Sequence, residues 1–332
     1  MTRPSAVPPP VTAVFDASSR WLPARMAEVE DVLREQVGGH GELLGADAAA
    51  TLAAGGKRLR PMLVLICAGE AGGAEAVRAA SAIELVHMAT LVHDDVLDDA
   101  PLRRGAPTVA AATRGGRPRA PGVQQQERAL ATGDLLLSRA FALLADAGDA
   151  RAVKLLADAS VSLARGELAQ RQDAFDLSVS ERRYLERCRL KTGTLFECAC
   201  LLGYDDEHLR RFGAEVGLAF QLLDDVLDVT GPAERTGKAR GTDLLDGTVT
   251  LPLILARRAD RVIEGTDLRG IDQDAAEALC DRIAATPVLD EVRDRAREGI
   301  TRAKRILEEP DFTDEERQLF AMIADGVVER YS

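Results

Sequence analysis

The segment LVHDDVLDDA at residues 91–100 shares the pentamer DDVLD with QLLDDVLDVT at residues 221–230. On a helix, Asp94 and Asp98 lie on one face because side chains four residues apart stack along the axis. Like charges at this spacing destabilise a helix unless a cation lies between them. The repeat therefore predicts two helices, each presenting paired carboxylates to a cation.

The sequence around the pentamers has the composition and the period of helices. Hydrophobic residues make up 46% of the 332 residues and aromatic residues only 4%. Apolar residues recur at three- and four-residue spacing from Trp21 to the end, without the alternation that is typical of strands. LPLILARRA at 251–259 fits a short strand or a helix that starts near Pro252. We expect one all-α domain over residues 21–332.

Three segments lack this period. Residues 1–20 are rich in Pro, and we expect a disordered tail there. The segment at about 110–127 is rich in Gly, Pro, Arg and Gln and has no apolar face, so we expect an exposed, mobile loop. A third loop, with several glycines, is expected over 230–252.

Composition excludes several classes of function. The formal net charge of −12 argues against nucleic acid or an anionic membrane surface as the main partner. No apolar run approaches the length of a transmembrane helix. The chain has no Walker loop, no GxGxxG unit and no EF-hand loop. None of the five cysteines forms a CxxC pair, so we expect reduced thiols in a cytoplasmic protein.

Carboxylates from two helices point to a hard divalent cation. Mg²⁺ prefers oxygen ligands and is typically bound by a few carboxylates together with substrate phosphates. A single pentamer could equally be a solvated helix end. Two copies embedded in Leu and Val favour a pair of acidic faces that bind Mg²⁺ and a diphosphate.

Basic residues follow or precede these acidic helices. Each one alone reads as a surface charge, but phosphate groups are recognised by Arg forks and Lys charges near helix ends. His87 lies two helical turns before Asp94 on the same face, which favours a ligand role over that of a core histidine. The candidates are Lys57, Arg60, His87, Arg103, Arg104, Lys191 and Lys238.

Taken in order, six motifs resemble those of the trans-isoprenyl diphosphate synthases, or polyprenyl synthetases, over residues 25–330. They are GGKRLRP, ELVHMATLVHDDVLDDAPLRRGAPT, GDLLLSRAF, RLKTGTLF, FQLLDDVLD and GKARGTDLLDGTVTLP. The resemblance implies an all-α isoprenoid-synthase bundle around a central cavity, in a homodimer. It implies a prenyltransferase that joins isopentenyl diphosphate head-to-tail (1′–4) to an allylic diphosphate. The segment between Pro107 and Gly133 is longer here than in most of the family.

The resemblance also implies residue roles. Mg²⁺, three ions per active site with substrate bound, would be held by Asp94, Asp95, Asp98, Asp224, Asp225 and Asp228. The allylic diphosphate would contact Arg103, Lys191, Thr192, Gln221 and Lys238. Isopentenyl diphosphate would contact Lys57, Arg60, His87 and Arg104.

Small residues precede each pentamer and bear on product length. Ala89 and Thr90 lie about one helical turn before Asp94, where shorter-product members of the family often carry an aromatic side chain. Gly217 and Gly213 precede the second pentamer. An open shaft at these positions predicts a medium or long all-trans product, with geranylgeranyl diphosphate as the alternative.

Two other functions remain as rivals. A class I terpene cyclase also uses DDxxD with Mg²⁺, but its second metal motif normally mixes Asn, Ser or Thr with Glu, whereas this chain repeats Asp. A non-catalytic synthase subunit would tend to lose acidic or basic site residues, and this sequence keeps them.

Overall fold

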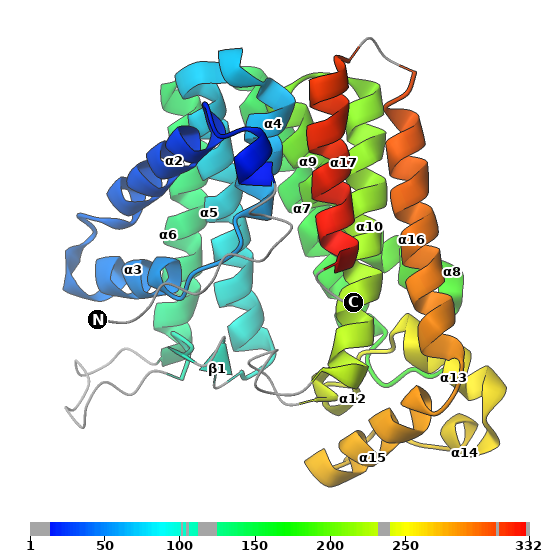
Figure 1. Cartoon of the computed structure of the whole chain (residues 1–332). Helices are drawn as coiled ribbons and strands as arrows, with labels where there is room; N and C mark the ends of the chain where they lie inside the picture. Colours follow the sequence, from blue (N-terminus) through cyan, green and yellow to red (C-terminus); the bar gives the residue numbers. More distant parts are fainter. Residues whose placement is uncertain are drawn as a thin grey trace.

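Helices make up most of the chain that the computed structural model describes, namely residues 14–100, 102–103, 106–111, 125–231, 240–309 and 312–329 (Figure 1). The expectation of an all-α fold is confirmed. The elements are α2 (Leu22–Val37), the π-helix η1 (Gly41–Gly45), α3 (Ala46–Ala53), α4 (Leu59–Ala68), the 3₁₀-helix η2 (Glu70–Gly72), α5 (Gly73–Leu97), β1 (Leu102–Arg103), β2 (Ala106–Pro107), α6 (Gln125–Asp146), α7 (Ala150–Gln172), α8 (Glu181–Cys188), the π-helix η3 (Arg189–Gly193), α9 (Thr194–Gly203), α10 (Glu207–Thr230), α12 (Thr242–Leu245), α13 (Leu251–Ala259), α14 (Arg261–Glu264), α15 (Gln273–Ala284), α16 (Val288–Ile306) and α17 (Asp314–Glu329).

Helix α5 runs through the middle of the bundle and ends in the first pentamer. It packs against α2, α4, α6 and α9, and its buried residues lie on all sides of the helix. A helix that is apolar all round is one that neighbours surround. Towards its C-terminal end, half-buried polar residues such as His87, His93 and Asp94 take the place of many apolar ones.

Helix α10 carries the second pentamer and forms the axis of the other half of the bundle. Asp206 caps its start, because the carboxylate accepts hydrogen bonds from the backbone N–H groups of His208 and Leu209 at 2.8 and 3.0 Å. The helix packs against α9, α16 and α17, and Phe212 meets Phe320 edge to face with ring centroids 5.5 Å apart. These contacts hold the start of α10 in the core, and its last turns stay buried through Val226 and Val229.

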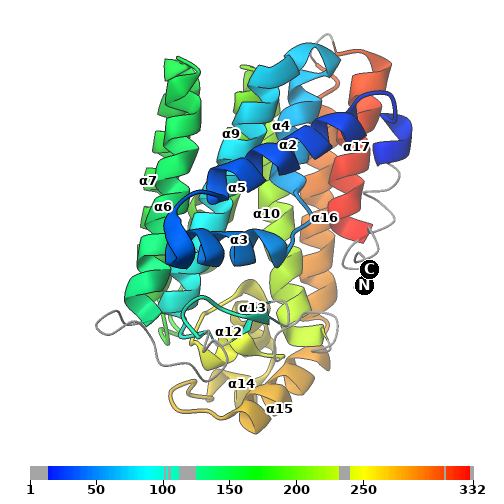
Figure 2. The same cartoon turned by 90° about the vertical axis from the view of Figure 1, so that its left-hand side faces the viewer.

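Helices α6 and α7 stand side by side at one margin of the bundle, as Figure 2 shows. Their outward side carries large apolar side chains that are exposed in the single chain. Leu130 is 46% exposed, and Val161 and Leu168 are each 59% exposed. Large apolar side chains are therefore exposed on both helices, among charged ones such as Lys154 and Asp158.

The structure differs from the sequence-based expectations, or decides between them, in three short segments. LPLILARRA is a helix, α13, because Pro252 occupies the first helical turn, where its fixed φ and missing N–H are tolerated. The short antiparallel pair of β1 and β2 was not expected. Residues 14–17, placed in the predicted tail, form a helical turn whose Val14 packs into the core at 1% exposure, so the folded part begins before Trp21.

Other expectations lie wholly or partly outside the described residues. The predicted tail is not described over residues 1–13, nor the predicted mobile loop over 112–124. The later loop contains α12 but is not described over 232–239. Of the described helices, none is both long enough and apolar enough to cross a membrane.

Candidate active site

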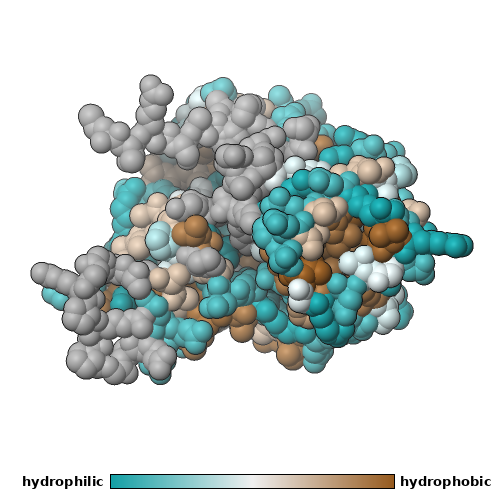
Figure 3. Space-filling view, turned by 90° about the horizontal axis from the view of Figure 1, so that it is seen from below, coloured by the Kyte–Doolittle hydropathy of each residue, from teal (hydrophilic) through white to brown (hydrophobic). Residues whose placement is uncertain are grey.

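The two pentamers lie at the same end of the bundle, shown at the bottom of Figures 1 and 2. Asp98 follows the last residue of α5, and Asp228 lies in the last turn of α10. Neither helix has a basic residue in its last turn. Carboxylates at the negative end of a helix dipole are unfavourable, so both helix ends attract cations. Seen from this end, hydrophobic residues show among hydrophilic ones where the atoms are not grey (Figure 3).

The three carboxylates of the first pentamer lie in two different environments. Asp94 and Asp98 share a face, as the helical period predicts, and both approach cations from α7 and η3. Asp95 points elsewhere: it is 5% exposed and accepts a hydrogen bond from Nε of Arg103 at 2.7 Å. Arg103, on β1, is thus brought to the pentamer through Asp95.

Glu167, on α7, contacts both of the cations that reach the first pentamer. The carboxylate of Glu167 contacts Nζ of Lys191 and accepts a hydrogen bond from Nε of Arg171 at 2.9 Å. Lys191 is also 4.0 Å from Oδ2 of Asp94, and the other end of the Arg171 guanidinium contacts Asp98. Burial disfavours the charge on Glu167, but Lys191 and Arg171 outweigh it and lower the pKa of that carboxyl.

The second pentamer is held by a chain of hydrogen bonds. The hydroxyl of Thr192 donates to Oε1 of Gln221 at 2.6 Å, and Nε2 of Gln221 donates to Asp225 at 2.7 Å. The hydroxyl of Tyr184 donates to the other oxygen of Asp225 at 2.6 Å. Asp225 is buried at 3% exposure, whereas Asp224 is exposed. The Asp225 carboxylate therefore fixes α10 to α8 through Tyr184, and the Asp224 side chain faces outward.

Asp228 meets a carboxylate that sequence reasoning did not select. Its Oδ2 accepts a hydrogen bond from the backbone N–H of Asp243, on α12, at 3.2 Å. Burial, followed by the charge of Asp243, raises the pKa of both Asp225 and Asp228. Burial also raises the pKa of Asp94 to about 6, although Lys191 opposes the rise. Carboxyl groups are crowded and desolvated at both helix ends.

This donor set fits a hard divalent cation. All the candidate ligands are carboxylate oxygens, and their crowding favours a cation that neutralises them. Within the described ranges, no three His, Cys, Asp or Glu side chains converge into a complete metal cage. Mg²⁺ does not need one, because it usually keeps several waters and is held by one or two carboxylates plus substrate phosphates.

The π-helix η3 connects the two acidic helix ends. Its neighbouring residues Lys191 and Thr192 reach Asp94 on one side and Gln221 on the other. π-helical turns are rare and are frequent at functional sites. The two pentamers, 130 positions apart in sequence, therefore flank one five-residue segment that carries a cation and a hydroxyl group.

The remaining basic candidates lie on other segments. Lys57 is exposed just before α4, and His87 is half-buried on α5. The Arg60 guanidinium lies over the Phe196 ring at 4.9 Å from its centroid. Arg104 and Lys238 lie outside the described residues.

The neighbouring Arg58 has a different role. With φ of 50°, it turns inward and pairs with Glu30 and Glu84, each at 2.7 Å. It therefore anchors the start of α4 to α2 and α5.

Among the proposed chain-length positions, Ala89 is buried at 1% exposure, and Thr90 is half-buried with its hydroxyl bonded to the His87 carbonyl at 2.8 Å. The expectation that Gly213 and Gly217 leave a shaft open was wrong. A Cβ on Gly213 would lie 2.6 Å from the Phe196 carbonyl oxygen, so these glycines serve the close packing of α10 on α9.

Sequence reasoning missed four residues of this site: Glu167, Arg171, Tyr184 and Asp243. The four-residue spacing of Glu167 and Arg171 was a signal that they share a helix face. Asp243 lies inside a quoted motif, GTDLLDG. Tyr184 had no signal, because its partner is 41 residues away.

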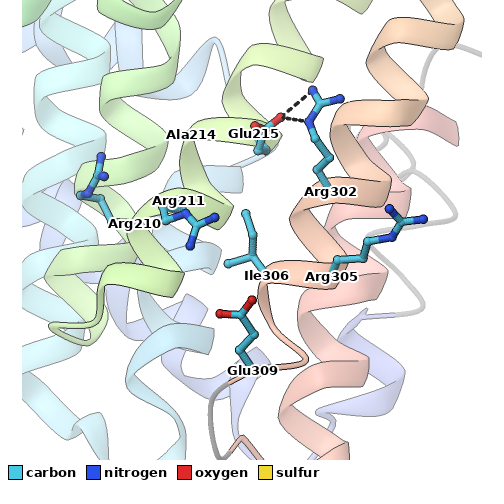
Figure 4. Close-up of a pocket in the computed structure, with 8 residues that line it drawn as sticks. All are labelled: Arg210, Arg211, Ala214, Glu215, Arg302, Arg305, Ile306 and Glu309. Carbon is cyan, nitrogen blue, oxygen red and sulfur yellow. Dashed lines mark hydrogen bonds and ion pairs between the residues drawn. The ribbon is translucent and has the colours of Figure 1, made fainter.

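A hollow lies on another face of the molecule, between the first half of α10 and the last half of α16 (Figure 4). Its volume is about 340 Å³, and four of its eight lining residues are arginines. Arg302 is fixed there by Glu215 at 2.9 Å. None of the predicted site residues lines this cleft, so it is separate from the acidic helix ends.

Comparison with known proteins places the chain among enzymes of one kind. A sequence model of the polyprenyl synthetase family matches residues 42–278. Heptaprenyl diphosphate synthase component 2 of Geobacillus stearothermophilus is 39% identical over 267 residues, covering 77% of this chain and 80% of that protein. Nonaprenyl diphosphate synthase of Mycobacterium tuberculosis is 34% identical over 334 residues, covering 94% and 90%. A polyprenyl synthase of Caulobacter crescentus, solved with calcium and isoprenyl diphosphate, is 31% identical and superposes over 100% of both chains with a TM-score of 0.85.

Proposed function

Since the chain belongs to the polyprenyl synthetase family, we propose that it condenses isopentenyl diphosphate head-to-tail (1′–4) with an allylic diphosphate. It is a prenyltransferase that makes prenyl diphosphates. The observation that carries the proposed site is the connection of both acidic helix ends by η3, through Lys191 to Asp94 and through Thr192 to Gln221.

The proposed allylic site uses both helix ends. Lys191, Thr192 and Gln221 would bind the diphosphate, together with Arg103 and Lys238. Asp94, Asp98, Asp224 and Asp228 would face the metal ions, and Asp95 and Asp225 would bind them with the lone pairs that their present hydrogen bonds leave unused. Mg²⁺, which we propose binds as three ions per substrate complex, supplies Lewis-acid charge that stabilises the departing diphosphate.

In the proposed reaction, the allylic diphosphate supplies the leaving group and isopentenyl diphosphate supplies the nucleophile. The allylic C–O bond breaks and its electron pair leaves on the diphosphate, which Lys191 stabilises. The double bond of isopentenyl diphosphate then attacks the allylic carbon, and a proton is lost to the released diphosphate. Lys57, Arg60, His87 and Arg104 would hold the isopentenyl diphosphate in position. Buried apolar residues of α5 exclude water from the cation.

We propose a medium or long all-trans product. The support is that Ala89 and Thr90 place no large side chain before Asp94, and that the relatives described above are named for heptaprenyl and nonaprenyl products. Geranylgeranyl diphosphate is the alternative, because a larger side chain deeper in the molecule could stop growth at that length.

The test is to incubate the purified protein with Mg²⁺, isopentenyl diphosphate and farnesyl diphosphate and to measure product length by mass spectrometry. Products longer than geranylgeranyl diphosphate are expected. A product that stops at geranylgeranyl diphosphate would favour the alternative. Consumption of an allylic diphosphate without isopentenyl diphosphate would indicate a cyclase, and no turnover by the pure chain would indicate a partner-dependent subunit.

We also propose a homodimer that forms through α6 and α7. The support is the exposure of three large apolar side chains on these helices, Leu130, Val161 and Leu168. The Geobacillus relative is named as one component of a synthase, so a different partner on this face is the alternative. The five free cysteines support a reducing, cytoplasmic location.

A further inference from the structure

Glu167 binds two cations, and each of them also reaches the first pentamer. Lys191 lies between Glu167 and Asp94, and Arg171 lies between Glu167 and Asp98. The cluster therefore has three carboxylates against two cations. Without Glu167, the two cations and the two pentamer carboxylates would neutralise each other.

That alternative pairing would compete with a metal ion. Nζ of Lys191 needs to move little, because it is already 4.0 Å from Asp94. Arg171 already contacts Asp98 with one end of its guanidinium while Glu167 holds its Nε. A guanidinium released from Glu167 could turn its fork onto a carboxylate, which is its preferred bidentate geometry.

Gly166, the residue before Glu167, allows the backbones of α7 and η3 to lie very close together. A Cβ on Gly166 would lie 2.7 Å from the backbone nitrogen of Lys191 and 3.0 Å from the carbonyl carbon of Leu190. Only a residue without a side chain lets α7 approach η3 this closely. The Glu167 side chain is 17% exposed, so little water weakens its ion pairs. Gly166 thus brings Glu167 directly to the π-helix.

We propose that Glu167 is a positioning residue that keeps the Lys191 ammonium off Asp94 and limits Arg171 to a contact with Asp98 through one end of its guanidinium. It thereby leaves Asp94, and the part of Asp98 that Arg171 does not occupy, available to Mg²⁺, and it keeps the Lys191 ammonium at the proposed diphosphate position. This inference rests on the proposed function of the site.

The test is a binding measurement that does not depend on turnover. Inorganic diphosphate is titrated into the protein by calorimetry at stepped Mg²⁺ concentrations. Glu167→Gln keeps the size of the side chain and removes its charge. The Mg²⁺ concentration that gives half-maximal binding should rise roughly tenfold or more, the loss typical of residues that support metal ligands. An unchanged Mg²⁺ requirement would overturn the inference.

Two further variants separate this role from a structural one. Glu197→Gln removes a similar, partly buried carboxylate that pairs with Arg210 at 2.9 Å on another face, and it should leave the Mg²⁺ requirement unchanged. In Glu167→Gln/Arg171→Gln, one competing cation is also removed, so the requirement should return towards the wild-type value. If the double variant needs as much Mg²⁺ for half-maximal diphosphate binding as Glu167→Gln does, Arg171 does not compete with the metal ion.

The controls also separate this inference from the proposed function. If the wild-type protein does not bind diphosphate with Mg²⁺ at all, the proposed function fails. If the wild type binds and Glu167→Gln binds equally well, only the role of Glu167 fails. Thermal unfolding of each variant shows whether a binding change comes from lost structure.

Discussion

At the scale of single residues, helical phase separates carboxylates that look alike in the sequence. Asp94 faces Lys191, whereas the adjacent Asp95 is turned to Arg103. In the second pentamer Asp224 is exposed and Asp225 is enclosed by Tyr184 and Gln221. Identical side chains in one pentamer are therefore expected to respond differently to substitution.

Replacing Asp94 by Asn should lower kcat by about a hundredfold or more, since it removes charge from the proposed site of diphosphate departure. The matched control is Asp99→Asn, because Asp99 is an exposed neighbour outside the pentamer. Its φ of 48° is one that Asn tolerates well. Steady-state assays with saturating Mg²⁺ measure both variants, and full turnover by Asp94→Asn would contradict the proposed site.

Replacing Tyr184 by Phe should lower the free energy of unfolding by about 1–3 kcal/mol, because a buried carboxylate loses one hydrogen-bond donor. The control is Tyr204→Phe, since Tyr204 is 59% exposed. Urea denaturation should show a lower midpoint for the first variant only. Equal midpoints would mean that the Tyr184 hydroxyl does not stabilise Asp225 in the folded protein.

At the scale of elements, close helix contacts decide where side chains from different helices meet. Gly166 brings α7 onto η3, and Gly213 brings α10 onto α9. The resulting contacts place Lys191 and Thr192 between α5 and α10. A small residue in a helix can thus position a charged residue on its neighbour.

Replacing a glycine by Ala should change the stability of the folded protein in opposite directions at two positions in long helices. Gly213→Ala should destabilise the protein by about 1–3 kcal/mol, because its Cβ would lie 2.6 Å from a backbone oxygen of α9. Gly299→Ala in α16 should stabilise it by about 0.5–1 kcal/mol, because the nearest atom would be 3.5 Å away and Ala favours a helix. Chemical denaturation measures both, and a stabilised Gly213→Ala would show that α10 can move away from α9.

At the scale of the whole molecule, the described residues show an acidic end, an arginine-lined cleft and a margin on α6 and α7 with exposed apolar side chains. The acidic end carries the proposed chemistry, and the cleft between α10 and α16 lies on another face. The margin on α6 and α7 is where a second copy of the chain is expected to bind, because burying its side chains would remove apolar area from water.

Val161→Glu should therefore convert the proposed dimer into monomers, because a charge would be buried without a partner. Val262→Glu is the matched control: Val262, on α14, is also 59% exposed but lies away from that margin. Analytical ultracentrifugation measures the mass of each variant. A monomeric wild type, or a Val161→Glu dimer as stable as the wild type, would exclude this face as the interface.

Helical period by itself placed Asp94 with Asp98 and Asp224 with Asp228, and it determined an all-α chain, because this period depends only on residues within a few turns. Motif order determined the family. The tertiary structure alone decided that Glu167 and Arg171 join the site, that Tyr184 and Asp243 meet the second pentamer, and that Gly213 serves packing instead of a shaft. These outcomes depend on how closely helices distant in sequence approach each other, and a local pattern does not contain that distance.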